Sequence, residues 1–292
     1  MKKIIVSFLL MNLFAVSCCT RRQQEHSFTS VTARNLDSVY KDILVRRCGE
    51  CAGSMKYDID VGVIDLSLTV SLQSPSLQNL DCLKDYPLRN LDLFSATNLC
   101  DITGLRGMKG LRFLYISDSL VTNLSPLENG IFFSLSLIDT PIVDLHPLKS
   151  CSIRSLDLSG TKISDNELSV LTDVSDLREL ALNSTKISDL KTITQLKLVS
   201  LSIDNTKVET ILPLTNMPLR VLSLINLKIP ENEIDILLEK ADIDKRPLGI
   251  ILPNENVKES KLWKAGVGVA SEAEEALGVS GAAYQKKIKR GG

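Results

Sequence analysis

The 292-residue chain has few aromatic residues, few histidines and almost no net charge. Aromatic residues make up 4% of the sequence, and there are one tryptophan and two histidines. The 34 lysine and arginine residues balance 35 aspartate and glutamate residues, which argues against a general nucleic-acid-binding protein. The longest apolar stretch, residues 4–16, is shorter than the roughly 20 residues of a membrane-spanning helix. The composition therefore indicates a globular protein with an aliphatic core and without a transmembrane helix.

Motifs of the common enzyme classes are missing as well. The sequence contains no G-x-S-x-G, no phosphate-binding glycine loop and no H-E-x-x-H. A nucleophilic pair of Cys151 with His146 is conceivable, but no third residue that would orient the histidine is evident. Cys48 and Cys51 form a C-x-x-C whose thiols could pair as a disulfide, stay free, or take part in metal or redox chemistry. Because further zinc ligands at suitable spacing are missing, we expect no metal site. Since the enzyme motifs are missing too, we expect no catalytic residue and no cofactor.

The first 17 residues have the layout of a secretory signal peptide. Two lysines precede the apolar residues 4–16, and small residues stand just before Cys18. The run Ala15-Val16-Ser17-Cys18 resembles the bacterial lipobox, in which the cysteine becomes the first residue of the mature protein and receives acyl chains. The polar residues 18–29 would then tether the protein to a membrane of the cell envelope. The alternative is ordinary signal cleavage nearby, which would give a secreted protein with Cys18 as a plain thiol.

An apolar pattern recurs about every 21 residues from residue 88 onward. Each copy has apolar residues at positions 1, 4, 6, 11, 14 and 17 and, in most copies, a threonine at position 9. Ordering 21 residues costs about 20–40 kcal/mol, whereas burying six aliphatic side chains returns only about 9–18 kcal/mol. One copy is therefore unstable alone, and we expect the copies to stack into an array. The clearest copies are Phe132-Leu135-Leu137-Thr140-Ile142, Leu177-Leu180-Leu182-Thr185-Ile187 and Leu198-Leu201-Ile203-Thr206-Val208.

This pattern resembles the leucine-rich repeat, whose usual form is L-x-x-L-x-L-x-x-N-x-I. The resemblance covers residues 63–242, with Val63, Leu66 and Leu68 as the start of a degenerate first copy. It implies an α/β repeat fold, a leucine-rich-repeat solenoid that forms a curved right-handed horseshoe. A parallel sheet would line its concave side and short 3₁₀ or helical segments its convex side. Threonine replaces the usual asparagine of position 9 at Thr97, Thr140, Thr161, Thr185 and Thr206.

The remaining residues flank the array. Residues 30–62 are expected to form an N-terminal cap that contains a helix over residues 35–47, since their apolar residues recur at helical spacing. Residues 63–253 comprise the repeats and a closing strand over residues 248–252. In the two longer copies, we expect helical turns over residues 166–171, capped by Ser164 and Asp165, and over residues 231–240 after Pro230. Residues 254–292 are expected to be a C-terminal tail.

The side chains at positions 3, 5, 7 and 8 of each copy are expected to form the concave face. These positions carry no lysine or arginine, and their acidic residues are Asp65, Asp92, Asp118, Asp139, Asp157, Glu179 and Asp204. An apolar patch on this face should comprise Phe94, Phe113, Tyr115 and Ile138, with Asp92, Asp118 and Asp139 around it. Such a surface suits a basic peptide or protein segment. The alternative is that these side chains pack under the cap or against one another.

Position 10 carries a lysine in four consecutive copies. These residues are Lys162, Lys186, Lys207 and Lys228. Acidic residues follow them in the same loops, namely Asp165, Asp189, Glu209 and Glu231. The interleaving favours solvated charge that opposes wrong assembly, and a binding role for the lysines is the alternative.

The sequence thus predicts a non-catalytic module that binds a protein or peptide, with neither nucleic acid nor a small-molecule cofactor as partner. It would be displayed on the bacterial cell envelope and held at the membrane by the N-terminal lipid. Repeat folds do not fix a ligand, so two alternatives stay open. One is a structural envelope protein whose solenoid acts as a spacer, and the other is a cytosolic regulator whose N-terminus only resembles a signal.

Maturation at Cys18 is directly testable by intact-mass measurement of the native protein. We expect the mass to show the loss of residues 1–17 and the gain of acyl chains. A Cys18→Ala variant should lack the acyl mass, because the acceptor thiol is gone. Retention of Met1 in the native protein would contradict both export and anchoring.

Overall fold

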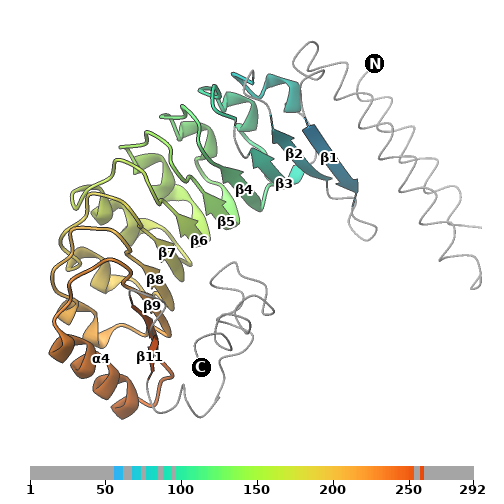
Figure 1. Cartoon of the computed structure of the whole chain (residues 1–292). Helices are drawn as coiled ribbons and strands as arrows, with labels where there is room; N and C mark the ends of the chain where they lie inside the picture. Colours follow the sequence, from blue (N-terminus) through green and yellow to red (C-terminus); the bar gives the residue numbers. More distant parts are fainter. Residues whose placement is uncertain are drawn as a thin grey trace, which may run out of the picture.

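The computed structural model describes residues 56–61, 68–73, 77–84, 88–93, 96–252 and 257–259. They form a curved arch in which strands line the inner side and short helical segments line the outer side (Figure 1). The expected signal peptide, Cys18, the tether, the cap helix over residues 35–47 and most of the tail lie outside the described residues.

The strands of the described residues form a single eleven-stranded sheet in which strand order follows chain order. Neighbouring strands from β2 to β10 are parallel. At the two ends, β1 pairs antiparallel with β2, and β11 pairs antiparallel with β10. The strands are β1 (Lys56–Val61), β2 (Leu68–Gln73), β3 (Leu88–Leu93), β4 (Phe113–Ile116), β5 (Ile131–Ser136), β6 (Ser152–Asp157), β7 (Glu179–Ala181), β8 (Ser200–Ser202), β9 (Val221–Ser223), β10 (Gly249–Ile251) and β11 (Val257–Glu259).

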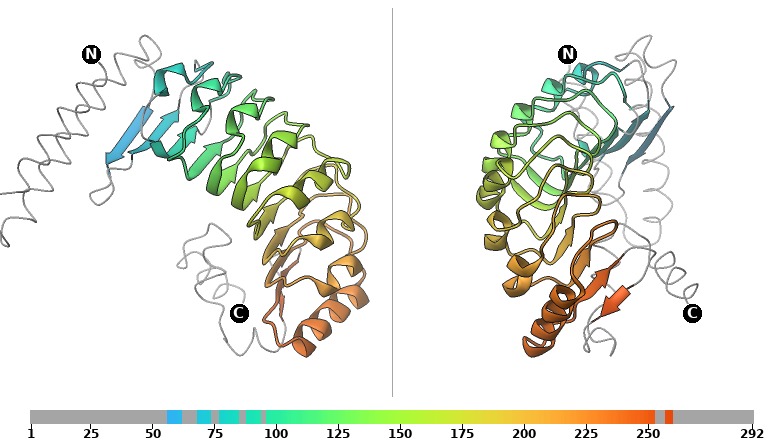
Figure 2. Two further views of the ribbon diagram at one scale, coloured as in Figure 1. Left: turned by 180° about the vertical axis from the view of Figure 1, so that it is seen from behind. Right: turned by 60° about the vertical axis from the view of Figure 1, so that its left-hand side comes forward.

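One short helical segment follows each repeat strand on the convex side, and these segments stack along the arch (Figure 2). Most are 3₁₀ segments because a 21-residue coil leaves no room for a longer helix. The last coil is longer and forms an α-helix, as expected after Pro230. The segments are η1 (Asp81–Leu83), η2 (Thr103–Leu105), η3 (Ser125–Leu127), η4 (His146–Ser150), η5 (Glu167–Asp173), η6 (Thr192–Gln195), η7 (Leu212–Asn216) and α4 (Glu231–Ile243).

The core runs through the arch between the sheet and the helical segments. In each clear copy the residues at positions 1, 4, 6, 11, 14 and 17 are buried, as the pattern predicted. In the coil that starts at Leu177, for example, Leu180, Leu182 and Ile187 are at most 2% exposed. The parallel sheet, the convex 3₁₀ segments and this repeated core confirm the fold of a leucine-rich-repeat solenoid.

Backbone hydrogen bonds join each coil to the next beyond the strands themselves. The N–H of position 6 donates to the carbonyl of position 5 in the following coil, as from Leu182 to Ser202 at 2.8 Å. The N–H of position 8 donates to the carbonyl of position 7 in the following coil, as from Ser184 to Asp204 at 2.8 Å. These bonds pair donors at the turn that would otherwise lie between coils without a partner.

Position 8 adopts a left-handed backbone conformation in six successive coils. The residues there are of types that tolerate positive φ, because they lack a Cβ or carry a short polar side chain. They are Asp118, Asp139, Gly160, Ser184, Asn205 and Asn226, with φ between 52° and 70°. The turn into the convex half therefore depends on residue type at position 8 as well as on the apolar pattern.

The position-9 threonines stabilise the same turn from inside. The hydroxyls of Thr140, Thr161 and Thr185 are buried, and each donates to the carbonyl of position 6 in its own coil at 2.6–2.7 Å. Thr206 is half-buried and makes the same bond to Ile203 at 2.7 Å. These hydroxyls therefore bind the turning backbone from inside the coil.

A second side-chain turn precedes the convex segments. In several coils position 13 carries an aspartate or asparagine whose Oδ1 accepts the N–H two residues later, at the start of the 3₁₀ segment. The bonds run from the N–H of Thr103 to Asp101 at 2.7 Å and from that of His146 to Asp144 at 2.9 Å. Asn79, Asn123 and Asp189 accept in the same way. These acids are thus part of the coil rather than free surface charge.

Two details of the predicted register are wrong. Leu68 pairs with Leu88, and Val70 pairs with Leu91, so Leu68 stands near position 1 of the first copy and not at position 6. In the next copy Ala96 is the buried residue at position 9, and Thr97 is exposed. A degenerate copy and an inserted residue both leave the apolar spacing ambiguous, and strand pairing resolves it.

Antiparallel strands close both ends of the described sheet. β1 adds an antiparallel strand within the residues assigned to the helical cap, and β11 adds one within the segment assigned to the tail. β10 forms the expected closing strand. Asp165 does not cap η5, because its carboxylate accepts the N–H groups of Ser188 and Asp189 in the next coil.

The buried threonine hydroxyl can be tested by Thr185→Val, which keeps the side-chain shape. We expect it to lower the free energy of unfolding by about 1–3 kcal/mol, because the Leu182 carbonyl loses its buried donor. The matched control is Thr172→Val. Thr172 is exposed and donates to Ser169 at 2.7 Å with the same spacing. That control should cost less than about 0.5 kcal/mol. Equal losses in urea titrations would contradict the assigned register.

Candidate functional site

The concave face contains positions 2, 3, 5 and 7 of each coil. In β3, β5 and β6 a buried residue at position 1 is followed by two outward residues, and position 4 returns to the core. In β5, Phe132 is 4% exposed and the adjacent Phe133 is 48% exposed. The concave surface thus includes position 2 in addition to positions 3, 5 and 7, which strand alternation predicted.

The apolar side chains on this face gather over β4 and β5. Phe113 and Phe133 meet edge to face, with ring centroids 5.7 Å apart and ring planes at 67°. Phe113 is half-buried, whereas Tyr115 is 37% exposed and Ile131 is 50% exposed. We call Phe113, Tyr115, Ile131 and Phe133 the aromatic patch.

The structure brings together part of the predicted patch. Phe113 and Tyr115 lie on β4 as expected, and Ile138 is half-buried at position 7 of the next coil. Phe94 and Asp65 lie outside the described residues. Sequence reasoning missed Phe133 and Ile131, because the expected concave positions began at position 3.

A row of arginines at position 2 was missed for the same reason. Backbone bonds connect this position from coil to coil, as from the N–H of Arg112 to Arg89 at 2.8 Å and from that of Arg178 to Arg154 at 2.9 Å. The row is visible in the sequence once position 2 is counted. It reads Arg89, Arg112, Phe133, Arg154, Arg178, Val199 and Arg220. The concave face is therefore acidic only when this row is left out.

Some of these guanidinium groups serve the fold. Arg112 donates to the Ile131 carbonyl at 3.2 Å, and Arg178 donates to the Lys197 carbonyl at 3.3 Å. Both carbonyls lie near the start of the following strand, where they would otherwise face solvent. The Arg154 side chain is exposed, and its guanidinium makes no hydrogen bond or ion pair in the described part of the chain. Arg154 is thus available to a ligand.

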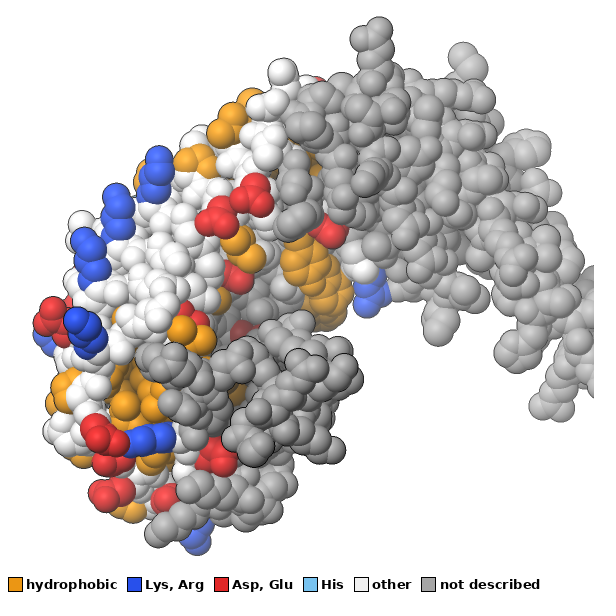
Figure 3. Space-filling model, viewed as in Figure 1, with side chains coloured by type: hydrophobic (Ala, Val, Ile, Leu, Met, Phe, Trp, Pro, Cys, Tyr) orange, Lys and Arg blue, Asp and Glu red, His pale blue; other side chains and the backbone are white. Residues whose placement is uncertain are grey.

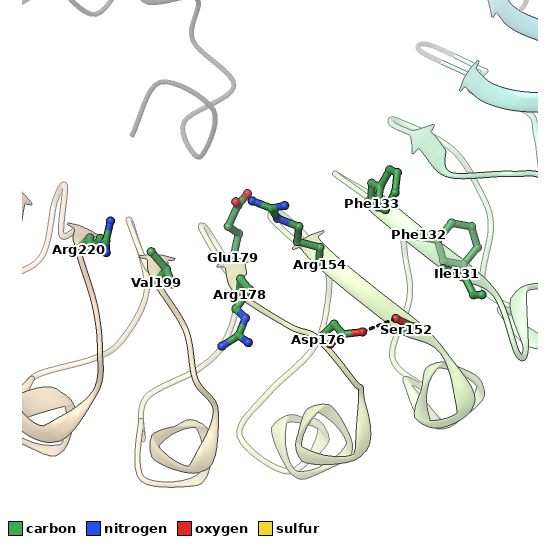
Figure 4. Close-up of a pocket in the computed structure, with 10 residues that line it drawn as sticks. All are labelled: Ile131, Phe132, Phe133, Ser152, Arg154, Asp176, Arg178, Glu179, Val199 and Arg220. Carbon is green, nitrogen blue, oxygen red and sulfur yellow. Dashed lines mark hydrogen bonds between the residues drawn. The ribbon is translucent and has the colours of Figure 1, made fainter. Parts of the chain in front are cut away.

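A groove of about 510 Å³ runs from the aromatic patch along the arginine row. Its apolar side chains include Phe133 and Val199, and its charged side chains include Arg154, Arg178 and Glu179. In Figure 4, Arg154 and Glu179 point toward one another above the strands. Ser152 donates to Asp176 at 2.9 Å on the groove wall. The groove therefore offers an apolar end and a mixed-charge floor.

Several acids predicted on the concave face have roles in the coil. Asp118 and Asp139 occupy the left-handed position 8 with φ 52°, and their side chains are exposed. Asp204 accepts the Ser223 hydroxyl and the Ile225 N–H, each at 2.7 Å, so it joins two coils. Asp92 is half-buried on β3. Asp118 and Asp139 keep carboxylates that a ligand could reach at the strand ends.

The structure does not bring Cys151 and His146 together as a nucleophilic pair. Cys151 is buried, its Sγ lies 3.2 Å from the Leu127 carbonyl, and burial raises its thiol pKa. His146 is exposed and contacts Asp144, whose carboxyl pKa is lowered by the hydrogen bond from the His146 backbone N–H. In the described residues Cys100 and Cys151 are free thiols, and no cluster of potential ligands could hold a metal ion. Cys48 and Cys51 lie outside that part.

No helix in the described part of the chain is both long enough and apolar enough to cross a membrane.

The neighbours Phe132 and Phe133 allow a matched test of the concave register. Phe132→Ala should lower the free energy of unfolding by about 3–5 kcal/mol, because it opens a cavity in the core. Phe133→Ala should cost about 1 kcal/mol or less, since it removes one edge-to-face contact at the surface. Urea titration of both variants measures the difference. The reverse order would place Phe133 in the core and remove the aromatic patch.

Comparison with solved structures finds bacterial proteins of similar fold. An internalin (inlF) from Listeria monocytogenes is 22% identical with a TM-score of 0.45, over 60% of this chain and 57% of that one. Internalin C2 from the same organism is 21% identical with a TM-score of 0.48, over 67% and 86%. A leucine-rich-repeat protein from Leptospira interrogans is 19% identical with a TM-score of 0.39, over 64% and 59%.

Scans against protein-family models and curated proteins found no match. The chain spans less than two thirds of the inlF and Leptospira proteins. At these identities the likeness concerns the fold alone, and the assignment of the fold stands on the repeat geometry itself.

Proposed function

We propose that the chain is a non-catalytic module that binds a protein or peptide on its concave face. The observation that carries this proposal is the aromatic patch. In the described residues the exposed large aromatic side chains are Tyr115 and Phe133, and both lie in this patch. A surface that needed only solubility would not gather them at one place on the inner side of an arch.

The patch can supply useful binding energy. Fully burying one large apolar side chain contributes about 1.5–3 kcal/mol, and Phe133, Tyr115 and Ile131 each keep more than a third of their surface exposed. Aromatic side chains near the centre of an interface commonly dominate its affinity. Because the edge-to-face contact already fixes Phe113 and Phe133, little side-chain entropy is lost when a partner packs on them.

Charges on either side of the patch would orient the partner. Arg154 lies on the groove side, at the starts of the strands, while Asp118 and Asp139 lie at the strand ends. A bound segment therefore places an apolar side chain on the patch, a basic group toward the aspartates and an acidic group toward Arg154. The proposed partner segment is therefore basic only at the end that meets Asp118 and Asp139, whereas the sequence alone predicted a basic segment for the whole site.

The proposed location is the bacterial cell envelope, with the protein held by a lipid on Cys18. Support comes from the signal layout of residues 1–17 and from the resemblance of Ala15-Val16-Ser17-Cys18 to a lipobox. Display of a binding face at the end of a polar tether, residues 18–29, is consistent with capture of a partner at the membrane surface.

A structural spacer is the main competing function, and photocross-linking in living cells separates the two. A photoreactive phenylalanine analogue at position 133 should yield one dominant protein adduct, because that ring lies in the aromatic patch. The matched control places the same analogue at Ile236, which is 42% exposed on α4 of the convex side. The control should not yield that adduct.

The adduct at position 133 should also weaken when Arg154→Glu is added, since that change reverses the charge beside the patch. A spacer predicts no dominant adduct at position 133, or the same products at both positions. Either result would contradict concave-face binding.

A further inference from the structure

A second charged row lies away from the concave face, on the flank where the strands turn toward the convex side. It consists of the position-10 lysines Lys162, Lys186, Lys207 and Lys228, which we call the lysine row. All four side chains are exposed. Figure 3 shows basic side chains in a line along this part of the arch. The row is separated from the aromatic patch by the left-handed turn at position 8.

Backbone bonds hold the row in register. The N–H of position 10 donates to the carbonyl of position 11 in the preceding coil, from Lys186 to Ile163 at 3.1 Å and from Lys207 to Ile187 at 3.0 Å. Lys162 bonds in the same way to Ile142 at 3.3 Å. Since the coils continue the spacing of paired strands, successive lysines are about 5 Å apart at the backbone.

The lysine side chains have no partner among the residues that the structure describes. None of the four makes a hydrogen bond or an ion pair in the described part of the chain. The acids that follow them are mostly engaged elsewhere. Asp165 accepts three hydrogen bonds from Ser188 and Asp189, and Glu231 pairs with Lys258 at 2.7 Å.

Asp189 likewise accepts the Lys191 N–H at 2.9 Å and lies 3.5 Å from the Lys191 ammonium. Glu209 is exposed and has no such partner among the described residues. In the described part of the chain, therefore, none of these four acids forms an ion pair with a lysine of the row.

The fold itself does not require lysine at position 10. The backbone makes the inter-coil bond, and two earlier coils carry Leu120 and Pro141 there. Four like charges in adjacent coils repel one another, so the row slightly destabilises the array unless an anion neutralises it. We propose that the lysine row binds a linear anionic polysaccharide, with carboxylate or sulfate groups along the chain.

Neighbouring side chains favour a polysaccharide over other polyanions. Beside the lysines runs the exposed position-8 row of Ser184, Asn205 and Asn226. Asn226 Nδ2 donates to Asn205 Oδ1 at 2.7 Å, which leaves the Asn205 amide nitrogen, the Asn226 amide oxygen and the Ser184 hydroxyl to bond to sugar hydroxyls. The row is one side chain wide, so a linear chain can follow it, whereas a flat membrane would also meet Asp165 and Glu209. Single-stranded nucleic acid commonly needs aromatic stacking, and the exposed aromatics of the described residues lie on the concave face.

The test measures binding of a heparin octasaccharide to the full chain by isothermal titration calorimetry. We expect binding that weakens as salt concentration rises. The K162Q/K186Q/K207Q/K228Q variant should bind at least about tenfold more weakly, because it removes the row. The matched control is K109Q/K149Q/K191Q/K197Q, which removes the same charge from scattered exposed positions. It should keep most of the affinity.

The outcomes separate clearly. Circular dichroism should show that both variants melt like the parent, since surface lysines are changed. Equal loss of affinity in the two variants would show that binding depends on net charge and not on the lysine row, and it would overturn the proposal. Absence of octasaccharide binding would do the same. Equal or tighter binding of polyglutamate, or of vesicles with anionic headgroups, with the same dependence on the row would assign it to a different partner class. None of these results bears on the aromatic patch.

Discussion

The hydrogen-bond ladder between coils is the constraint on which the rest of the structure depends. Each coil must pair its backbone with the next along the strand and again through the turn at positions 8 and 10. This requires a left-handed residue at position 8 and favours a buried hydroxyl at position 9, as at Thr161 and Thr185. The apolar positions then meet in one continuous core. A single coil satisfies neither requirement, so the array is stable only as an array.

The same ladder determines which side chains are left for binding. Aspartates that look like ligand contacts in the sequence instead form turns or join coils, as Asp144 and Asp204 do. Side chains without a role in joining the coils remain at some position-2 sites on the concave face and at position 10 on the flank. Exposed Phe133 and Arg154 occur at the first, and the lysine row occurs at the second. Two separate surfaces of different chemistry thus arise from one repeated path.

The sequence predicted the core almost residue by residue, because a 21-residue apolar pattern repeated this often has one plausible structural meaning. It was less informative where the pattern is interrupted. Leu68 and Thr97 were placed in the wrong register, since spacing alone cannot locate an insertion and strand pairing can. The sequence predicted Phe113 and Tyr115 of the aromatic patch but not Ile131 and Phe133. Strict alternation of inward and outward side chains along a strand assigns positions 3, 5 and 7 to the concave face and leaves out position 2. In the structure both residues after position 1 point outward, so Phe133 and the arginines of position 2 lie on the concave face.

Amide hydrogen exchange at position 8 tests the ladder most directly. A left-handed turn residue at the surface ordinarily exchanges fast, but here the N–H groups of Gly160 and Ser184 donate to the next coil at 2.8 Å. We expect them to exchange as slowly as the N–H groups of Leu158 and Leu182 at position 6, which bond to the next coil at 2.9 and 2.8 Å. Exchange at position 8 as fast as in an unstructured peptide would contradict the ladder and the register of both proposed surfaces.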